Sequence, residues 1–152
     1  MCDTRLAGGL SGGGGGSGRG SAVLTLREHT RYVVGVAQPR SHSAYSLVSG
    51  SVDSDVVTWD LRAGPRCLSV RSAHSRGFMT ALALHEYAPL TATGSSRQRA
   101  KVFTAGGEAV CDIKFHEGFA GQRIGQVSAL AWHPHKLVLA IGATDSLVDI
   151  LA

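Results

Sequence analysis

From Ala22 to the end of the chain, hydrophobic positions fall in short runs rich in Val, Leu, Ile and aromatic residues. Gly, Ser, Pro, Asp and His separate these runs, and no helical period is sustained. The pattern therefore predicts β-strands throughout this region. The expected strands cover residues 22–26, 32–37, 45–48, 55–59, 67–71, 78–84, 90–93, 100–103, 109–115, 126–132, 137–141 and 147–151.

The predicted strands belong to a sequence motif that is repeated with a period of 42 to 48 residues. Each copy has a histidine, a strand-like apolar run, and then a glycine that is followed nine positions later by an aromatic or apolar residue. The three copies contain His29, Gly50 and Trp59; His74, Gly94 and Phe103; and His116, Gly142 and Leu151. A repeat of this length, with Trp59-Asp60 closing the first copy, is typical of WD-repeat blades. The predicted fold is therefore all-β, with four-stranded antiparallel blades of a WD40 β-propeller.

The number of copies predicts an incomplete propeller. A closed propeller has about 4 to 8 blades, whereas this chain supplies about three and ends after the third strand of the last. We therefore expect the chain to be a piece of a longer protein. Residues 22–26 are expected to form the outer strand of a preceding blade.

The residues before 22 differ in composition from the repeats. Leu10 to Gly20 is nearly all Gly and Ser, which is typical of a flexible coil. The expected organisation is a disordered leader over residues 1–21 and a partial propeller over residues 22–152. Hydrophobic residues make up 43% of the chain, enough for the packed interior of a folded region of this size.

Cysteine usage and hydropathy predict an intracellular protein. Cys2, Cys67 and Cys111 are odd in number and widely spaced, which argues against a disulfide framework or a thiolate zinc site. No apolar run approaches the roughly 20 residues that span a bilayer, and the first residues lack the apolar core of a signal peptide. We expect a cytoplasmic protein without membrane insertion.

The charge pattern argues against nucleic-acid binding. Lys and Arg total 15 against 11 Asp and Glu, and the formal net charge is +4. The densest basic group is Arg97, Gln98, Arg99 and Lys101, where no aromatic residues are interleaved to stack on bases. A phosphate contact is possible there, but a charged sheet edge that discourages strand pairing is the favoured interpretation.

The first repeat contains the residue types of a hydrolase triad, but their spacing favours a structural role. Catalysis needs an exposed nucleophile beside its base and an oxyanion hole, and no Gly-x-Ser-x-Gly turn occurs. In WD repeats, a turn Asp accepts a hydrogen bond from a His, the His bonds a strand Ser or Thr, and that hydroxyl meets a Trp indole. We predict this network for His29, Ser49, Asp53 and Trp59. The chain is therefore expected to be neither catalytic nor a binder of a small-molecule substrate.

The later repeats keep only part of this set. The second repeat has His74, but Arg97 occupies the position equivalent to Asp53, and Phe103 occupies the position equivalent to Trp59. The third has His116 and Asp145 and ends in Leu151. The predicted structural residues of these repeats are His74, His116 and Asp145.

A group of histidines and a glycine-rich loop could suggest metal binding and phosphate binding, but the spacing of their residues does not favour either. His133-Pro134-His135, with His85 and His116, invites a metal site, but histidines two positions apart around a proline are more simply turn residues. The loop 118–125 lacks the ending of a phosphate-binding loop and precedes a strand. We therefore expect no metal and no cofactor. Gln122 and Arg123 in this loop are candidates for a protein contact.

The same loop carries a specific resemblance. Gly118-Phe119-Ala120-Gly121-Gln122-Arg123-Ile124-Gly125, followed by Val127 to His135, resembles the C-terminal WD repeats of the raptor family, the regulatory-associated scaffolds of the target-of-rapamycin (TOR) kinase complex. Residues 27–30, 84–85 and 140–145 match that family's order and spacing, so the resemblance covers about residues 24 to 151.

The resemblance implies a noncatalytic adaptor whose propeller is an interaction platform for proteins of the TOR kinase complex. The family's caspase-like and helical-repeat regions have no counterpart here, so only the propeller role carries over. A generic WD40 adaptor in another multiprotein complex is the alternative.

Overall fold

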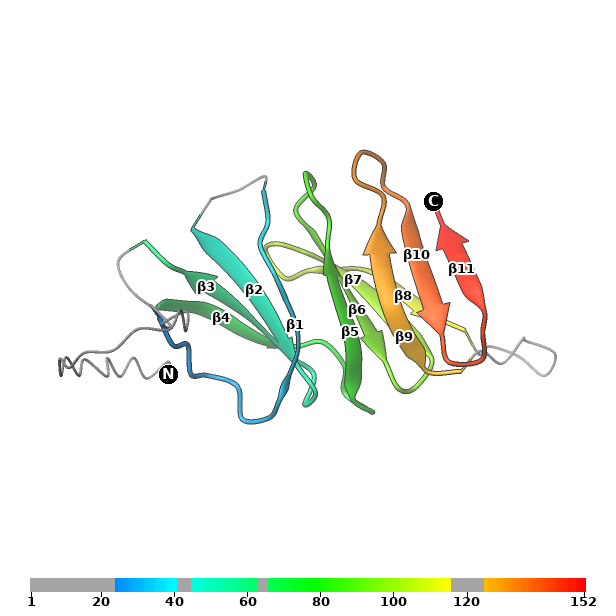
Figure 1. Ribbon diagram of the computed structural model, residues 1–152, viewed down its shortest axis with the longest axis horizontal. Coiled ribbons are helices and arrows are strands. Elements are labelled where there is room, and N and C mark those ends of the chain that lie inside the picture. Colours follow the sequence, from blue (N-terminus) through cyan, green and yellow to red (C-terminus); the bar gives the residue numbers. More distant parts are fainter. Residues whose placement is uncertain (1–23, 41–44, 63–65, 116–124) are drawn as a thin grey trace, which may run out of the picture.

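The computed structural model describes residues 24–40, 45–62, 66–115 and 125–152. These residues form three antiparallel sheets arranged in a row (Figure 1). Blade 1 contains β1 (Val33–Ala37), β2 (Ser46–Ser51), β3 (Asp55–Asp60) and β4 (Arg66–Ser72). Blade 2 contains β5 (Met79–Leu84), β6 (Leu90–Ser95), β7 (Arg99–Thr104) and β8 (Ala109–Lys114). Blade 3 contains β9 (Val127–Trp132), β10 (Leu139–Ala143) and β11 (Val148–Leu151).

Each sheet is a meander in which consecutive strands pair, and the innermost strands β1, β5 and β9 lie side by side. The all-β prediction and the prediction of blades are confirmed. Eleven of the expected strands are present, with ends shifted by a few residues. In the described part of the chain, no helix is long and apolar enough to cross a bilayer.

The strand expected over residues 22–26 is not observed where the structure describes it. Residues 22 and 23 lie outside the described residues, and Leu24 to Leu26 have no regular secondary structure. An isolated strand leaves its backbone groups without ladder partners, and no described strand pairs with this segment. The expected leader over residues 1–21 also lies outside the described residues.

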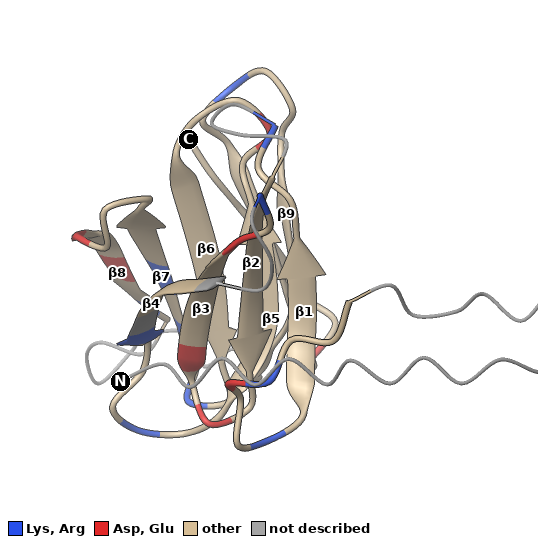
Figure 2. Ribbon diagram, turned by 90° about the vertical axis from the view of Figure 1, so that its left-hand side faces the viewer, with Lys and Arg blue, Asp and Glu red and all other residues tan. Residues whose placement is uncertain are grey.

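Charge is confined to the outer part of each blade. The two inner strands of every blade (β1 and β2, β5 and β6, β9 and β10) carry no Asp, Glu, Lys or Arg. Figure 2 accordingly shows charged residues on the turns and on the outer strands. This division is expected because neighbouring blades cover both faces of the inner strands.

Two apolar interfaces hold the blades together. Val48 and Val56 of blade 1 pack with Met79 and Phe103 of blade 2. The second interface joins small residues of blade 2 to larger ones of blade 3: Ala81, Ala92, Ala100 and Val102 pack against Val127, Leu139 and Ile141. The core of the molecule is therefore between blades, and each sheet depends on its neighbour for burial.

Glycines at one repeated position allow this close approach. A Cβ atom at Gly50 would lie 2.7 Å from Met79 Sδ, and one at Gly94 would overlap the Val127 side chain. A side chain at Gly94 would displace the short, branched Val127, whereas at Gly50 it would displace the flexible Met79 side chain, so glycine is needed most at position 94.

Candidate functional site

The first blade forms two of the three hydrogen bonds predicted for the WD network. Trp59 Nε1 donates to Ser49 Oγ at 2.8 Å, and Ser49 Oγ is hydrogen-bonded to His29 Nε2 at 2.7 Å. The His29 and Trp59 rings also meet edge to face, with centroids 6.5 Å apart. The Ser49 hydroxyl therefore joins the segment before β1 to strands β2 and β3.

The predicted hydrogen bond between His29 and Asp53 is not formed. Among the residues that the structure describes, His29 Nδ1 and Asp53 Oδ1 are both buried without a hydrogen-bond partner, and Asp53 Oδ2 instead accepts from Thr30 Oγ1 at 2.7 Å. Burial lowers the pKa of His29, although the nearby carboxylates of Asp53, Asp55 and Glu28 act in the opposite direction. Burial, together with repulsion from Asp53, raises the pKa of Asp55.

Blade 2 has no equivalent network. His74 and Thr93 are buried, yet His74 Nε2 and Thr93 Oγ1 have no hydrogen-bond partner among the described residues. Phe103, which replaces the tryptophan, offers no donor and instead lies under the guanidinium of Arg71, 5.9 Å from its ring centroid. Burial, and to a lesser degree the charges of Lys101 and Arg99, lowers the pKa of His74 to about 4.

In blade 3, the described residues include the turn carboxylate of the predicted network, Asp145. Asp145 Oδ2 accepts from the backbone N–H of Gly125 at 2.5 Å, which fixes the chain just before β9. In blade 1, the bond from Thr30 to Asp53 fixes the chain before β1 in the same way. His116, Gln122 and Arg123 lie outside the described residues.

Two of the histidines considered as metal ligands, His85 and His133, bond to the backbone of the turns that follow them. His85 Nδ1 accepts from the backbone N–H groups of Tyr87 and Ala88 at 3.1 and 2.9 Å, so its Nε2–H is free to donate to Lys136 O at 3.2 Å. His133 Nδ1 likewise accepts from the N–H groups of His135 and Lys136. Within the described residues, no group of three His, Cys, Asp or Glu side chains could hold a metal ion.

The basic group at 97–101 is partly used within its own sheet. Arg99 forms a two-pronged pair with Asp112 on β8, with its Nε and Nη2 at 3.2 and 2.7 Å from the two carboxylate oxygens. The Arg97 side chain lies over Gly77, where a Cβ atom would be 2.5 Å from Arg97 Cγ. Gly77 has a φ of 84°, so both its conformation and its close contact require glycine.

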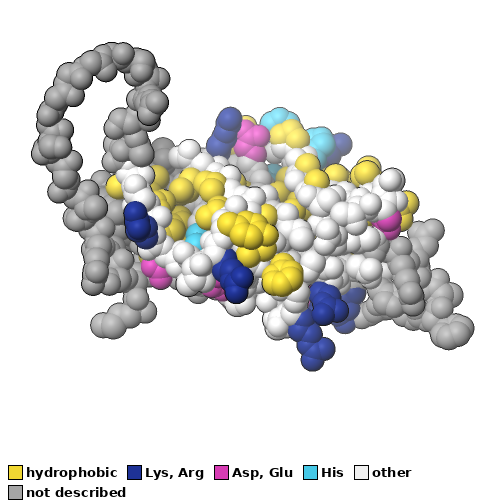
Figure 3. All heavy atoms as spheres, turned by 60° about the horizontal axis from the view of Figure 1, so that its bottom comes forward, with side chains coloured by type: hydrophobic (Ala, Val, Ile, Leu, Met, Phe, Trp, Pro, Cys, Tyr) yellow, Lys and Arg dark blue, Asp and Glu magenta, His cyan; other side chains and the backbone are white. Residues whose placement is uncertain are grey.

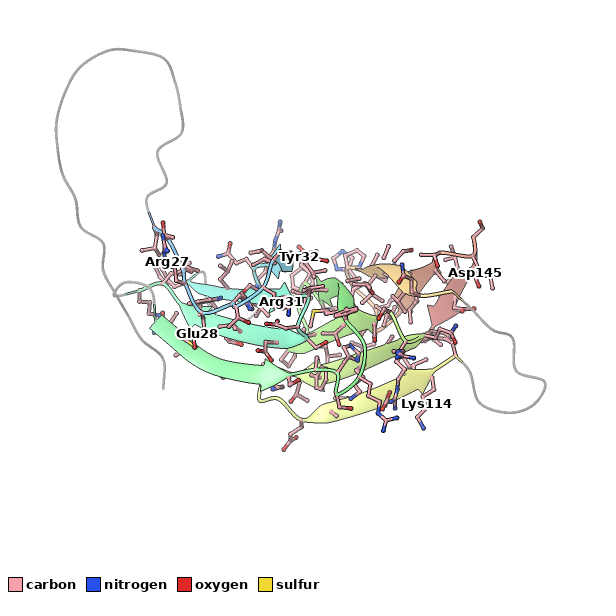
Figure 4. All side chains as sticks on the ribbon, turned by 90° about the horizontal axis from the view of Figure 1, so that it is seen from below. Arg27, Glu28, Arg31, Tyr32, Lys114 and Asp145 are labelled. Atoms are coloured by element: carbon pink, nitrogen blue, oxygen red, sulfur yellow. The ribbon has the colours of Figure 1, made fainter. Side chains whose placement is uncertain are left out.

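An exposed surface with aromatic and basic side chains lies at the end of the blades where β1 and β5 begin. We call it the loop-end face and define it by Arg31, Tyr32, Phe78 and Arg97. Tyr32 is 72% and Phe78 60% exposed, and the two arginines are also exposed. Figure 3 shows hydrophobic and basic side chains together on this side of the molecule, and Figure 4 labels Arg31 and Tyr32 on it.

The backbone fixes the two aromatic residues at equivalent positions of the repeat. Each directly precedes the innermost strand of its blade, and its carbonyl accepts a backbone hydrogen bond: Tyr32 O from Val52 at 3.1 Å, and Phe78 O from Ser96 at 2.9 Å. Their side chains border a hollow of about 640 Å³. Exposed aromatics with arginines on a fixed backbone are typical of the residues that contribute most to protein–protein binding.

Sequence reasoning did not single out this face. It placed Phe78 and Tyr32 at the starts of strands, where the alternation of a strand does not tell whether the first side chain is covered. The available signal was the repeat itself, because Tyr32, Phe78 and Gln126 all stand immediately before an innermost strand.

Comparison with known proteins gives consistent matches. The family described as "WD domain, G-beta repeat" matches residues 20–60. "Protein raptor homolog" of Dictyostelium discoideum is 42% identical over 133 residues, which is 88% of this chain and 9% of that protein. "Regulatory-associated protein of TOR 2" of Oryza sativa subsp. japonica is 40% identical over 134 residues, 86% of this chain and 10% of that protein.

Two more matches extend the comparison to fungi. "Target of rapamycin complex 1 subunit mip1" of Schizosaccharomyces pombe is 34% identical, covering 87% of this chain and 10% of that protein. The crystal structure of Chaetomium thermophilum Raptor matches with a TM-score of 0.66 at 21% identity, over 79% of this chain and 11% of that one, and so supports the fold. The chain spans about a tenth of the length of the curated relatives it matches.

Proposed function

We propose that this chain, which is homologous to the raptor proteins over most of its length, is a noncatalytic interaction scaffold of a cytoplasmic TOR kinase complex. The observation that carries the proposal is the 34 to 42% identity to raptor relatives, which extends over at least 86% of the chain in three of them. A match of this extent spans most of the chain.

The geometry supports a binding role. The Ser49 hydroxyl is already occupied by Trp59 and His29, so the group that resembles a hydrolase triad holds blade 1 together. The loop-end face, by contrast, presents large side chains that the described residues leave uncovered. We propose that it contacts a protein component of the complex.

The proposal is tested by affinity capture in cells that express the TOR complex. The tagged chain is expected to recover TOR kinase or its associated subunits, and a chain carrying Tyr32→Ala with Phe78→Ala should recover at least about tenfold less, since two central aromatic anchors are lost. Tyr87→Ala is the matched control because Tyr87 is 53% exposed but follows β5, at the opposite end of the blade.

Recovery of none of these components by the wild-type chain would contradict the proposal. Equal recovery by the Tyr32 and Phe78 variant would reject the loop-end face while leaving the scaffold role in place. Gln122→Ala with Arg123→Ala tests the loop that the sequence suggested as a contact, independently of the loop-end face.

A further inference from the structure

A hollow with basic walls lies at the end of blade 2 that belongs to the loop-end face. It has a volume of about 420 Å³ and is lined by Ser96, Arg97, Gln98, Arg99 and Lys114. Three of these residues carry a positive charge and none carries a negative charge. We call it the basic hollow; Figure 4, which views the molecule from this end, labels Lys114, one of its residues. A lining of one sign favours a ligand of the opposite charge.

Two of the cations in the basic hollow do not have the role that the sequence suggested. A charged strand discourages pairing only at an open sheet edge, but β7 pairs with β6 on one side and with β8 on the other. Arg99 is the first residue of β7, and Arg97 lies in the turn before it. The expectation of a charged sheet edge is therefore wrong for these two residues.

The basic hollow brings like charges close together. Arg99 and Lys114 stand directly opposite each other in the pairing of β7 with β8, and like charges in this arrangement destabilise an antiparallel pair. Asp112 accepts the two-pronged bond from Arg99. Arg97, by contrast, forms no ion pair with any of the described residues. Its charge can therefore be neutralised by an anion bound in the hollow.

Hydrogen-bond donors are held in place around the basic hollow. Arg99 donates to Asp112 from Nε and Nη2, at 3.2 and 2.7 Å, and this fork orients the guanidinium while its other N–H groups can donate to a ligand. Ser96 Oγ accepts from the backbone N–H of Phe78 at 3.0 Å, so its own O–H proton is left to be donated elsewhere. Several fixed donors beside one surplus charge suit a phosphate group, whose oxygens accept several hydrogen bonds at once.

A buried histidine is influenced by the same positive charges. Burial is the main cause that lowers the pKa of His74 to about 4, and the charges of Lys101 and Arg99 lower it further, although Asp112 acts in the opposite direction. The effect of the basic side chains on β7 therefore reaches a buried group, and Asp112 does not cancel it.

The basic hollow adjoins the aromatic part of the loop-end face. Ser96 lines both the basic hollow and the hollow that Tyr32 and Phe78 border. A place for one anionic group thus lies next to a place for apolar side chains, and a phosphorylated segment of a protein offers both within a few residues. A membrane surface would instead be contacted by basic residues spread over a broad face.

We propose that the basic hollow binds a phosphoserine or phosphothreonine of a protein partner. Arg97, Arg99 and Ser96 donate hydrogen bonds to the phosphate, and Phe78 contacts the residues beside it. A phosphate carries a charge of about −1.5 to −2 at pH 7, whereas a carboxylate has one charge and two oxygens and so uses fewer of these donors. The inference rests on the proposed contact of the loop-end face with a protein, and makes that contact depend on phosphorylation of the partner.

Fluorescence polarisation with the full chain tests the proposal. The probe is a labelled pool of short peptides with a central phosphoserine and random flanking residues. This pool is expected to bind at least about tenfold more tightly than the same pool with serine or glutamate at the centre, and its affinity should decrease as the salt concentration is raised. Equal affinity for the three pools would overturn the proposal.

One variant and a matched control locate the phosphate. Arg97→Gln removes an exposed charge from the basic hollow and should weaken binding of the phosphoserine pool at least about tenfold. Lys136→Gln removes the same charge from an exposed position between β9 and β10, at the opposite end of the blades, and should leave the affinity unchanged. Thermal unfolding verifies that both variants stay folded. Unchanged binding by the Arg97 variant, or an equal loss in both, would reject the basic hollow as the site.

Sedimentation with lipid vesicles tests the other source of phosphate. Vesicles of phosphatidylcholine and phosphatidylserine are expected to leave the chain in solution. Sedimentation of the chain with these vesicles, together with no preference for the phosphoserine pool, would overturn the proposal in favour of a membrane surface.

Phosphatase treatment separates this inference from the proposed scaffold role. Capture of TOR complex components by the tagged chain should decrease when the lysate is first treated with a protein phosphatase. Undiminished capture would contradict recognition of a phosphorylated partner and leave the scaffold role in place. Capture of no component from either lysate, with tight binding of the phosphoserine pool by the purified chain, would contradict the scaffold role and support the phosphate site.

Discussion

Trp59 on β3 donates its indole N–H to the hydroxyl of Ser49 on β2, at 2.8 Å. Both side chains are buried, 3% and 5% exposed, and the same hydroxyl meets His29 Nε2 at 2.7 Å. One small polar group thus satisfies two larger ones inside blade 1. The relationship is structural, because Ser49 is buried beneath these two rings and a nucleophile has to be exposed to its substrate.

Removal of this hydroxyl should destabilise the chain. Ser49→Ala leaves Trp59 Nε1 buried without an acceptor and His29 Nε2 without its partner, so the free energy of unfolding is expected to fall by about 1 to 3 kcal/mol. Urea denaturation followed by Trp fluorescence measures the change. Ser128→Ala is the control, since Ser128 is exposed and its hydroxyl bonds only the Gly142 carbonyl among the described residues. A loss no larger than that of the control would show that the network does not contribute.

The sequence predicted the blades well because the repeat encodes both strand order and strand spacing. Gly50, Gly94 and Gly142 recur at the same register position in β2, β6 and β10. The alternation of apolar runs and polar turns indicates which segments are buried as strands, and the strands of the structure lie in those segments. Strand ends differ by a few residues because pairing with the neighbouring strand decides where each ladder stops.

The interactions that the sequence did not predict depend on three-dimensional placement. The bond expected between His29 and Asp53 is replaced by one from Thr30 to Asp53, a choice between adjacent residues that spacing alone does not determine. The strand expected over residues 22–26 is absent at Leu24 to Leu26, where no described strand lies beside the chain to pair with it. The exposure of Tyr32 and Phe78 likewise follows from which blade lies next to each strand end.

Alanine at Gly94 should be far more costly than alanine at Gly142. The added Cβ at Gly94 overlaps Val127, a fully buried residue of the next blade, and overpacking of this kind costs about 1 to 3 kcal/mol. At Gly142 the new atom makes ordinary contacts of 3.6 Å or more, and alanine should change the stability by at most about 1 kcal/mol in either direction. Chemical denaturation at low protein concentration compares the two variants. Equal destabilisation would contradict the close packing of blade 3 on Gly94.

His74 should make the stability depend on pH below neutrality. Burial lowers its pKa in the folded state to about 4 from the ordinary value of 6.5, so between these two values the unfolded chain binds more protons than the folded one. Stability is therefore lost as the pH falls from about 6.5 to about 4. Unfolding measured across this range should give a shallower slope for His74→Gln than for the wild-type chain.

A second variant connects this effect to its surroundings. Lys101 is the largest of the charges that lower the pKa of His74, after burial itself, and Asp112 opposes it. Lys101→Gln should raise the pKa of His74 in the folded state toward its ordinary value of 6.5. Stability should then be lost over a narrower range of pH, because the folded and unfolded pKa values lie closer together. Identical pH profiles for the wild-type and His74→Gln chains would show that the titration belongs to other groups.

His85 should couple blade 2 to blade 3. Its Nδ1 accepts two backbone N–H groups of its own turn, while its Nε2 reaches the Lys136 carbonyl at 3.2 Å, and its ring meets Trp132 edge to face with centroids 5.5 Å apart. His85→Asn retains a polar group near the turn but is too short to reach Lys136. We expect a loss of about 0.5 to 1.5 kcal/mol from the missing inter-blade bond.

The position of that loss distinguishes coupling between blades from a general loss of stability. Hydrogen exchange should become faster in β9 and β10, whose packing on blade 2 is weakened. It should change little in β2 and β3 of blade 1, because the hydrogen bonds of the His85 ring go to Tyr87, Ala88 and Lys136. His85→Gln is the matched variant, because its longer side chain can still donate to the Lys136 carbonyl and should restore slow exchange in blade 3. Faster exchange confined to blade 2 in both variants would mean that His85 stabilises only its own turn.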